Sequence, residues 1–228
     1  MSANNPNLHS LEQVALALQP LLGELVLVGG SAVGLLITDA ARPPVRATID
    51  VDLATEATPL MNYYALSDKL RNLGFRESSD NTCRWTKDGL IVDIVPTDEK
   101  VLGFTNRWYE LAVKMSLTTT LPSGLVIRHI SAPLMIASKV ESFYGRGKGD
   151  FSHHDIEDII NLVDGRPEIV GEVREAPTHL REYLEQEIDD LLTNSQFIDT
   201  LPMHINSSYV EQARLTLIIE RLRKMAGL

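Results

Sequence analysis

The sequence has little of what secreted or membrane-spanning proteins need. Cys83 is the single cysteine, so the chain has no intrachain disulfide and no cysteine-based zinc site. No apolar run approaches the roughly 18 uncharged residues that a membrane span requires. Residues 1–7 are polar rather than basic and then hydrophobic, which does not match a secretory signal. We therefore expect a protein of the reducing cytoplasm with no membrane partner.

Basic side chains are also scarce. The chain has 21 lysines and arginines against 31 aspartates and glutamates, which gives a formal net charge of -10. This balance excludes the broad basic field that drives non-specific binding to nucleic acid, so any phosphate must be held by local charges or by metal ions. A chain of 228 residues, 44% of them hydrophobic, is long enough for one large domain or two small ones.

The first part of the sequence alternates between strand and helix patterns. The capping box Ser10–Gln13 opens one apolar helical stripe, and the residues Lys87-Asp88-Gly89 form a turn signal between two β-prone runs. Strict alternation over residues 46–53 predicts a strand with one apolar and one polar face. The expected elements are a helix over 11–18, a strand over 25–28, a helix over 32–37, a strand over 46–53, a helix over 59–73 opened by Thr58-Pro59, a hairpin over 85–95 and a strand over 125–130.

From Ser131 onward all periodic segments have the helical period. They predict helices over 132–144, 153–164, 177–194 and 208–226, the last opened by a capping box at Ser208–Glu211. We therefore predict an α/β fold, a mixed sheet flanked by helices and followed by a helical C-terminal part. The predicted domains are residues 1–130 and residues 131–228.

A glycine pair and three aspartates carry the chemical interest of the sequence. Gly29-Gly30-Ser31 joins a strand to a helix, where adjacent glycines and unpaired helix N–H groups favour a bound polyphosphate. Asp50 and Asp52, two apart on one face of a predicted strand, suit shared ligation of one or two Mg²⁺ ions. Asp93 interrupts the apolar strand run 90–95, where a carboxylate is costly unless it is paired or metal-bound.

Each feature also has a plain structural interpretation. A glycine pair after a strand is usually only a turn, and polar residues on an alternating strand commonly face solvent. Arg46 shares the predicted face of Asp50, where it either reaches a phosphate or balances the carboxylates. The conjunction of these parts in this order is much more specific than any one of them.

Three segments together resemble the nucleotidyltransferase superfamily related to DNA polymerase beta. They are residues 28–31, the strand Thr48-Ile-Asp50-Val-Asp52-Leu53 and the later Val92-Asp93-Ile94. A second pattern looks like the C-terminal motif of the AbiEii-like branch of that superfamily. It consists of Ile136-Ala-Ser-Lys139, then Arg146, then the helix of Asp155 and Asp158. The likeness covers about residues 24–164, and it implies the nucleotidyltransferase fold.

The resemblance also implies a role for each matching residue. Gly29, Gly30 and Ser31, with Lys139, would hold the phosphates of a nucleoside triphosphate. Asp50, Asp52 and Asp93 would bind two Mg²⁺ ions, for which Mn²⁺ is an alternative, and Asp93 would help to deprotonate the attacking hydroxyl. Asp155 matches an aspartate near the active site of the family, although His154 stands where an arginine is often found and leaves the choice between Asp155 and Asp158 open.

The predicted activity is Mg²⁺-dependent transfer of a nucleotidyl group from a nucleoside triphosphate to a hydroxyl acceptor. By the same resemblance the acceptor is RNA, in particular a tRNA end, or a protein, and the chain is the toxin of a toxin–antitoxin or phage-defence system with a cognate antitoxin. Two alternatives stay open: a small antibiotic-type acceptor, and a non-catalytic nucleotide-sensing or partner-binding module with the same fold.

Overall fold

The computed structural model describes residues 5–56, 60–205 and 211–228, and the chain divides into two compact units. The sheet unit consists of Pro6–Gly34 and Arg46–Ser131, and the helical unit includes Leu35–Val45 and Ala132–Leu228. Residues 35–45 group with the helical unit and not with the rest of residues 1–130. The expected caps at Thr58-Pro59 and Ser208 lie outside the described residues.

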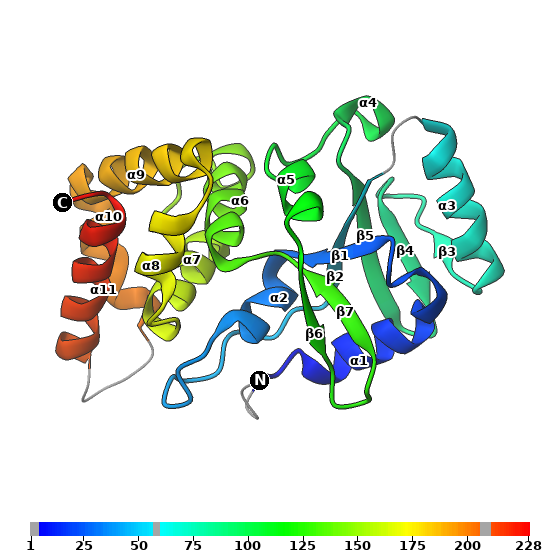
Figure 1. Cartoon of the computed structure of the whole chain (residues 1–228), viewed down its shortest axis with the longest axis horizontal. Coiled ribbons are helices and arrows are strands. Elements are labelled where there is room, and N and C mark those ends of the chain that lie inside the picture. The colour runs from blue at the N-terminus through cyan, green and yellow to red at the C-terminus, as the bar shows by residue number, and fades with distance from the viewer. Residues whose placement is uncertain (1–4, 57–59, 206–210) are drawn as a thin grey trace. The chain divides into compact units, whose positions relative to one another are not determined.

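The sheet unit is built around a seven-stranded mixed sheet with the strand order β3-β4-β5-β2-β1-β7-β6 (Figure 1). Neighbouring strands run antiparallel except for the parallel pairs β1–β7 and β2–β5. Its elements are α1 Leu8–Ala17, the 3-10 turn η1 Gln19–Leu21, β1 Leu25–Val28, α2 Gly29–Leu36, β2 Val51–Thr55, α3 Leu60–Asn72, β3 Arg76–Glu77, β4 Arg84–Lys87, β5 Leu90–Pro96, α4 Glu99–Leu102, α5 Tyr109–Lys114, β6 Leu117–Thr120 and β7 Val126–His129. The fold class, a mixed α/β sheet flanked by helices with helices at the C-terminus, is confirmed.

Helix α1 covers one face of this sheet with its apolar stripe. Its residues Leu11 and Val14, with Leu18 directly after it, line a small apolar space together with Leu27 of β1 and Leu53 of β2. Leu27 and Leu53 are register partners, and side chains alternate along a strand, so the next pair along the ladder faces the other side of the sheet. That next pair brings an aspartate to the face that α1 does not cover.

Strand β2 is shorter than the alternating pattern predicted. It begins at Val51, and Ile49, expected on the apolar face, is 87% exposed. The segment before it is held instead by the buried Asn7: Nδ2 of Asn7 donates to the carbonyl of Arg46 (3.2 Å), and N of Thr48 donates to Oδ1 of Asn7 (2.8 Å). A side chain thus replaces the strand partner that residues 46–48 would otherwise need.

Helix α1 also begins earlier than the sequence predicts. It starts at Leu8 after Asn7, whose side chain makes no cap hydrogen bond because it is committed to residues 46 and 48. The capping box predicted at Ser10 is therefore wrong.

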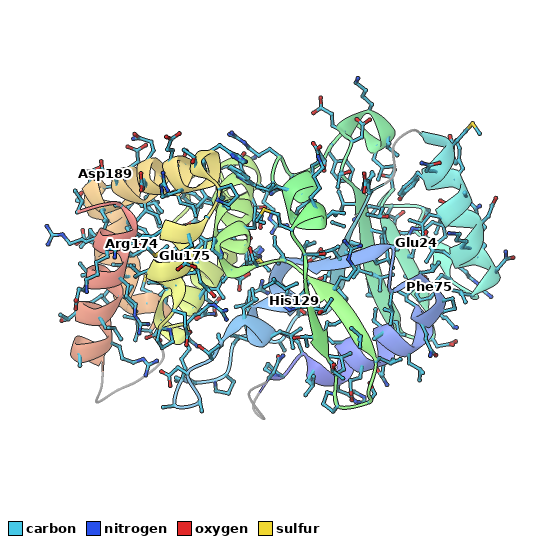
Figure 2. The ribbon with its side chains drawn as sticks, viewed as in Figure 1. Glu24, Phe75, His129, Arg174, Glu175 and Asp189 are labelled. Atoms are coloured by element: carbon cyan, nitrogen blue, oxygen red, sulfur yellow. The ribbon has the colours of Figure 1, made fainter. Side chains whose placement is uncertain are left out.

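The hairpin predicted over residues 85–95 is confirmed. Asp88 (φ 49°) and Gly89 (φ 84°) form its two-residue turn in the left-handed region, which matches the twist of two antiparallel strands. The resulting register places Arg84 of β4 opposite Asp93 of β5. Beside this hairpin Phe75 is almost fully buried in the same unit (Figure 2).

In the helical unit α6 packs on α7, and both helices contact further helices of the C-terminal part (Figure 1). Residues 35–45 join this unit because the N–H groups of Thr38 and Asp39 donate to the carbonyl of Gly165 at the end of α7, and a Cβ on Gly165 would lie 2.6 Å from Cδ of Arg42. The elements are α6 Ala132–Gly145, α7 His154–Gly165, α8 Ile169–Glu175, α9 Thr178–Thr193, α10 Ser195–Thr200, the 3-10 turn η2 Leu201–His204 and α11 Glu211–Met225.

Within the ranges that the structure describes, no helix is both long enough and apolar enough to cross a bilayer.

Candidate functional site

Two of the predicted aspartates lie side by side in the centre of the sheet. Asp52 of β2 is the register partner of Asp93 on the parallel strand β5, and of Val28 at the end of β1 on its other side. Residues in register on neighbouring strands point to the same face, so both carboxylates belong to the face opposite α1. The sheet therefore places this pair beside the point where β1 ends and α2 begins.

The glycine turn directly abuts one of these carboxylates. Gly29 adopts a left-handed φ of 66°, and a Cβ built on it would overlap Oδ2 of Asp52. Only glycine combines this conformation with this lack of space. The turn opens α2, whose first N–H groups lack intrahelical acceptors. The backbone at the start of α2 and the carboxylate of Asp52 are therefore in direct van der Waals proximity.

Ser31 in the first turn of α2 is completely buried, and its Oγ has no hydrogen-bond partner within the described part of the chain. A buried hydroxyl without a partner costs about 1–3 kcal/mol. The hydroxyl of Ser31, which the sequence predicts to bind phosphate, therefore makes no hydrogen bond to the described residues.

Asp50 reaches the same cluster from outside the strand. The prediction that it shares a strand face with Asp52 is wrong, because residue 50 precedes β2 in a bend. Its Oδ2 accepts a hydrogen bond from Nη2 of Arg84 at 2.6 Å. The same guanidinium donates from Nε to Oδ1 of Asp93 and from Nη2 to Oδ2 of Asp93, each at 2.8 Å. One nitrogen therefore joins Asp50 to Asp93.

Arg84 is the residue that sequence reasoning missed. Its signal was present, because a two-residue turn at Asp88-Gly89 fixes the hairpin register and sets Arg84 opposite Asp93. Arg84 also supplies the pairing that a carboxylate at Asp93 needs. The clustered aspartates do not need a metal ion merely to relieve their mutual repulsion, since a guanidinium already lies between two of them.

The negative charges of Asp93 and Asp52 also affect the pKa of the neighbouring Cys83. Burial, with the negative charges of Asp93 and Asp52, raises the pKa of the Cys83 thiol to about 12. The thiol therefore stays protonated at neutral pH, which removes it as a nucleophile. The candidate reactive groups on this face of the sheet are therefore its carboxylates.

The donor set fits a hard divalent ion. Asp50, Asp52 and Asp93 supply carboxylate oxygens, the ligands that Mg²⁺ prefers, and the guanidinium nitrogen of Arg84 marks a position where a cation contacts Asp50 and Asp93 at once. The closely packed glycine turn beside Asp52 is the second part of the fit. These three aspartates are therefore the candidate metal ligands.

Arg46 lies four residues before Asp50, half-buried, in the segment held by Asn7. The contact with its carbonyl positions the backbone rather than the guanidinium. A role for Arg46 at a phosphate stays a prediction.

Lys139, on α6, lies between two buried aspartates of α7. Its Nζ is 3.1 Å from Oδ1 of Asp155 and 2.6 Å from Oδ2 of Asp158, and all three side chains are at most 4% exposed. Both aspartates that the sequence left as alternatives therefore contact the lysine. The charge of Lys139 is balanced inside the helical unit, and its predicted contact with a triphosphate stays a prediction.

Asp155 has further partners. Arg146 forms a two-pronged contact with it, from Nε to Oδ2 at 3.0 Å and from Nη2 to Oδ1 at 2.8 Å. Burial alone would raise the pKa of Asp155, but the hydrogen bond from Arg146 and the charge of Lys139 lower it to about 2. The carboxylate is therefore ionised throughout the physiological range.

His153, His154 and Asp155 have ligand atoms within 4.8 Å of one another, a spacing that suits a metal ion. Asp155 already carries two cationic partners, which oppose a further cation, and Nδ1 of His153 accepts the N–H of residue 155 as the cap of α7. We therefore interpret these three residues as stabilising the N-terminus of α7.

No protein-family model and no curated protein matches the sequence. Among solved structures, the crystal structure of JHP933 from Helicobacter pylori resembles the chain at 12% identity. The likeness covers 96% of this chain and 92% of that one, with a TM-score of 0.47. These values carry no inference about activity, so the functional argument rests on the residues themselves.

Proposed function

We propose that this chain is a Mg²⁺-dependent nucleotidyltransferase that moves a nucleotidyl group from a nucleoside triphosphate to a hydroxyl acceptor and releases pyrophosphate. One observation carries the proposal: one guanidinium joins the carboxylates of Asp50 and Asp93, and Asp52, the register partner of Asp93, abuts the glycine turn at Gly29 that opens a helix. Phosphate-binding backbone and metal-binding carboxylates are the two parts that phosphoryl-transfer chemistry needs together.

Each residue has a defined task in this proposal. The first N–H groups of α2, with the unpartnered Oγ of Ser31, bind phosphate oxygens. Asp50, Asp52 and Asp93 would hold the Mg²⁺, which supplies charge neutralisation at the triphosphate. Asp93, 11% exposed by its side chain, accepts the proton of the attacking hydroxyl. Lys139 and Asp155 contact each other inside the helical unit, and their proposed roles in transfer rest on the family resemblance.

RNA or a protein is the proposed class of acceptor, with a role as a toxin and a cognate antitoxin. This part rests on the family resemblance alone. The net charge of -10 disfavours broad RNA contact, which keeps a small hydroxylated molecule as the alternative acceptor.

A non-catalytic nucleotide-binding module is a second candidate, and Arg84 is the observation that favours it. Its guanidinium balances Asp50 and Asp93 without any metal ion, as a permanent structural contact would. The two candidates differ in turnover, because a binding module holds the nucleotide and transfers nothing.

Label transfer tests the proposal. Wild-type protein and the variants Asp50→Asn and Asp52→Asn are incubated with each α-³²P-labelled nucleoside triphosphate, Mg²⁺ and total cellular RNA or protein. Because asparagine removes a ligand charge at nearly constant volume, we expect the wild type to transfer label and each variant to lose at least about 100-fold in rate. Transfer that persists in both variants would overturn the assignment, and nucleotide binding without transfer would favour the binding module.

A further inference from the structure

Arg84 occupies the place that a divalent cation would take. Its Nη2 lies within hydrogen-bond distance of Asp50 and of Asp93, and Nε makes the second contact with Asp93. We propose that Arg84 is an exchangeable cation: it bridges the two carboxylates in the ligand-free protein, yields them to the divalent ion, and then donates to the phosphates of the nucleotide. This inference rests on the proposed function and deepens it, by naming a residue that couples metal binding to nucleotide binding.

Arg84 and a divalent ion would compete for the same carboxylate oxygens of Asp50 and Asp93. A guanidinium is never deprotonated in proteins, so Arg84 cannot vacate the carboxylates by losing its charge. It must move. Its backbone is fixed in the hairpin register opposite Asp93, but its side chain is 31% exposed and therefore borders solvent. The exchange needs only a rotation of the long side chain about its own bonds, with β4 unchanged.

The movement of Arg84 away from the carboxylates has an energetic cost. Charge-assisted hydrogen bonds to carboxylates are stronger than neutral ones, so a divalent ion that arrives alone must displace Arg84 at a cost. An ion that arrives with a triphosphate brings a new anionic partner for the freed guanidinium, whose planar fork suits phosphate oxygens. Arg84 therefore makes the ion bind better with the nucleotide than without it. By linkage the nucleotide binds better with the ion by the same factor.

The exposure of Arg84 and Asp50 supports a transient role. Their side chains are 31% and 33% exposed, although Asp93 is mostly buried, whereas Lys139 and its two aspartates are at most 4% exposed. A buried ion pair is difficult to open because each charge would be left without a partner, whereas water reaches the contact between Arg84 and Asp50. The geometry thus favours exchange at Arg84.

Binding of Mn²⁺ followed by electron paramagnetic resonance tests the inference without catalytic turnover. Mn²⁺ is titrated into the wild type, Arg84→Ala, Arg84→Lys and the control Arg76→Ala, with and without an α,β-methylene analogue of the preferred nucleotide. Arg76 is an exposed arginine of the edge strand β3 in the same unit. Removal of the competitor should make Arg84→Ala bind Mn²⁺ alone about tenfold tighter than the wild type. The enhancement by the nucleotide should shrink by a similar factor.

The lysine variant keeps the charge but loses the two-pronged contact, so we expect it to lie between the wild type and Arg84→Ala. It decides the question if the alanine variant does not fold. Equal Mn²⁺ affinity and equal enhancement in the wild type and the Arg84 variants would overturn the inference while leaving the metal site intact, as would weaker Mn²⁺ binding by Arg84→Ala. Absence of any Mn²⁺ binding by the wild type would overturn the proposed function, and the inference with it.

Discussion

Two groups of three aspartates, one in each unit, differ in how their charges are balanced. The sheet cluster is Asp50, Asp52 and Asp93, and the helical cluster is the row Asp155, Asp158 and Asp164 along α7, in which Asp164 has partners of its own. The side chains of the helical cluster are at most 3% exposed, and lysine or arginine nitrogens contact all three aspartates, from Lys139, Arg146, Arg42 and Arg214. In the sheet cluster the guanidinium of Arg84 contacts Asp50, whose side chain is 33% exposed, and Asp93, whose side chain is 11% exposed.

This difference in charge balance gives the helical cluster a role in stability and the sheet cluster a role in binding. Buried carboxylates with several cationic partners hold helices together, and removing one partner leaves an uncompensated charge in the interior. Asp50, whose side chain is 33% exposed, keeps a carboxylate accessible to a new cation beside the guanidinium that it shares with Asp93. Residue type alone does not distinguish the two groups, because both are rows of aspartates in an acidic chain.

The largest expected effect is a loss of stability in the helical cluster. Asp155→Asn removes the carboxylate that Lys139 and Arg146 share, so we expect the free energy of unfolding to fall by about 3–5 kcal/mol in urea titrations. Asp199→Asn, at an exposed position of α10, is the control and should change it by less than about 0.5 kcal/mol. Unchanged stability in Asp155→Asn would remove the contrast between the clusters.

The pH dependence of stability sharpens the same point. The pKa of Asp155 is about 2 in the folded protein, below its value in the unfolded chain, so its contribution is complete above about pH 4 and decreases as the pH falls towards 2. We expect the difference in unfolding free energy between wild type and Asp155→Asn to narrow by about 2 kcal/mol between pH 5 and pH 2. A constant difference over this range would show that the carboxylate has an ordinary pKa.

A smaller effect is expected at the glycine turn. Alanine at Gly29 must take a left-handed φ, at a cost of about 1–2 kcal/mol, and its Cβ must displace Oδ2 of Asp52. Gly103→Ala is the matched control, because Gly103 has φ 83° with nothing near its Cβ position. Both variants should lose stability, but only Gly29→Ala should lose Mg²⁺-dependent nucleotide binding in equilibrium dialysis. Equal nucleotide affinity in the two variants would contradict the close approach at Gly29.

The smallest effect concerns the support of Asp50. Asn7→Ala removes the side chain that fixes residues 46–48, which should reduce stability by about 1 kcal/mol and weaken Mn²⁺ binding several-fold because Asp50 is held less firmly. Asn72→Ala, at the exposed end of α3, is the control. Mn²⁺ affinity that is the same in Asn7→Ala and the wild type would show that Arg84 alone holds Asp50.

Local signals explain what the sequence could predict. The Asp88-Gly89 turn, strand β1 and the glycine turn after it depend on residues adjacent in sequence, and each lies where the pattern predicted. The register of the hairpin was equally local, so the contact between Arg84 and Asp93 was within reach of the same reasoning.

Long-range contacts explain what the sequence did not predict. Strand β2 begins late because Asn7, about forty residues earlier, binds the preceding backbone. Residues 35–45 group with the helical unit because they bond to Gly165 and Asp164, far along the chain. The short strand β6 and the short helices α8 and α10 carry too few residues to show a period.

Equilibrium dialysis of a labelled nucleoside triphosphate, with and without Mg²⁺, measures whether the sheet cluster binds a nucleotide through a divalent ion. We expect saturable, Mg²⁺-dependent binding by the wild type and its loss in Asp52→Asn, with the thermal unfolding midpoint of the variant preserved. Equal binding by wild type and a folded Asp52→Asn, or no Mg²⁺-dependent binding by the wild type, would contradict it.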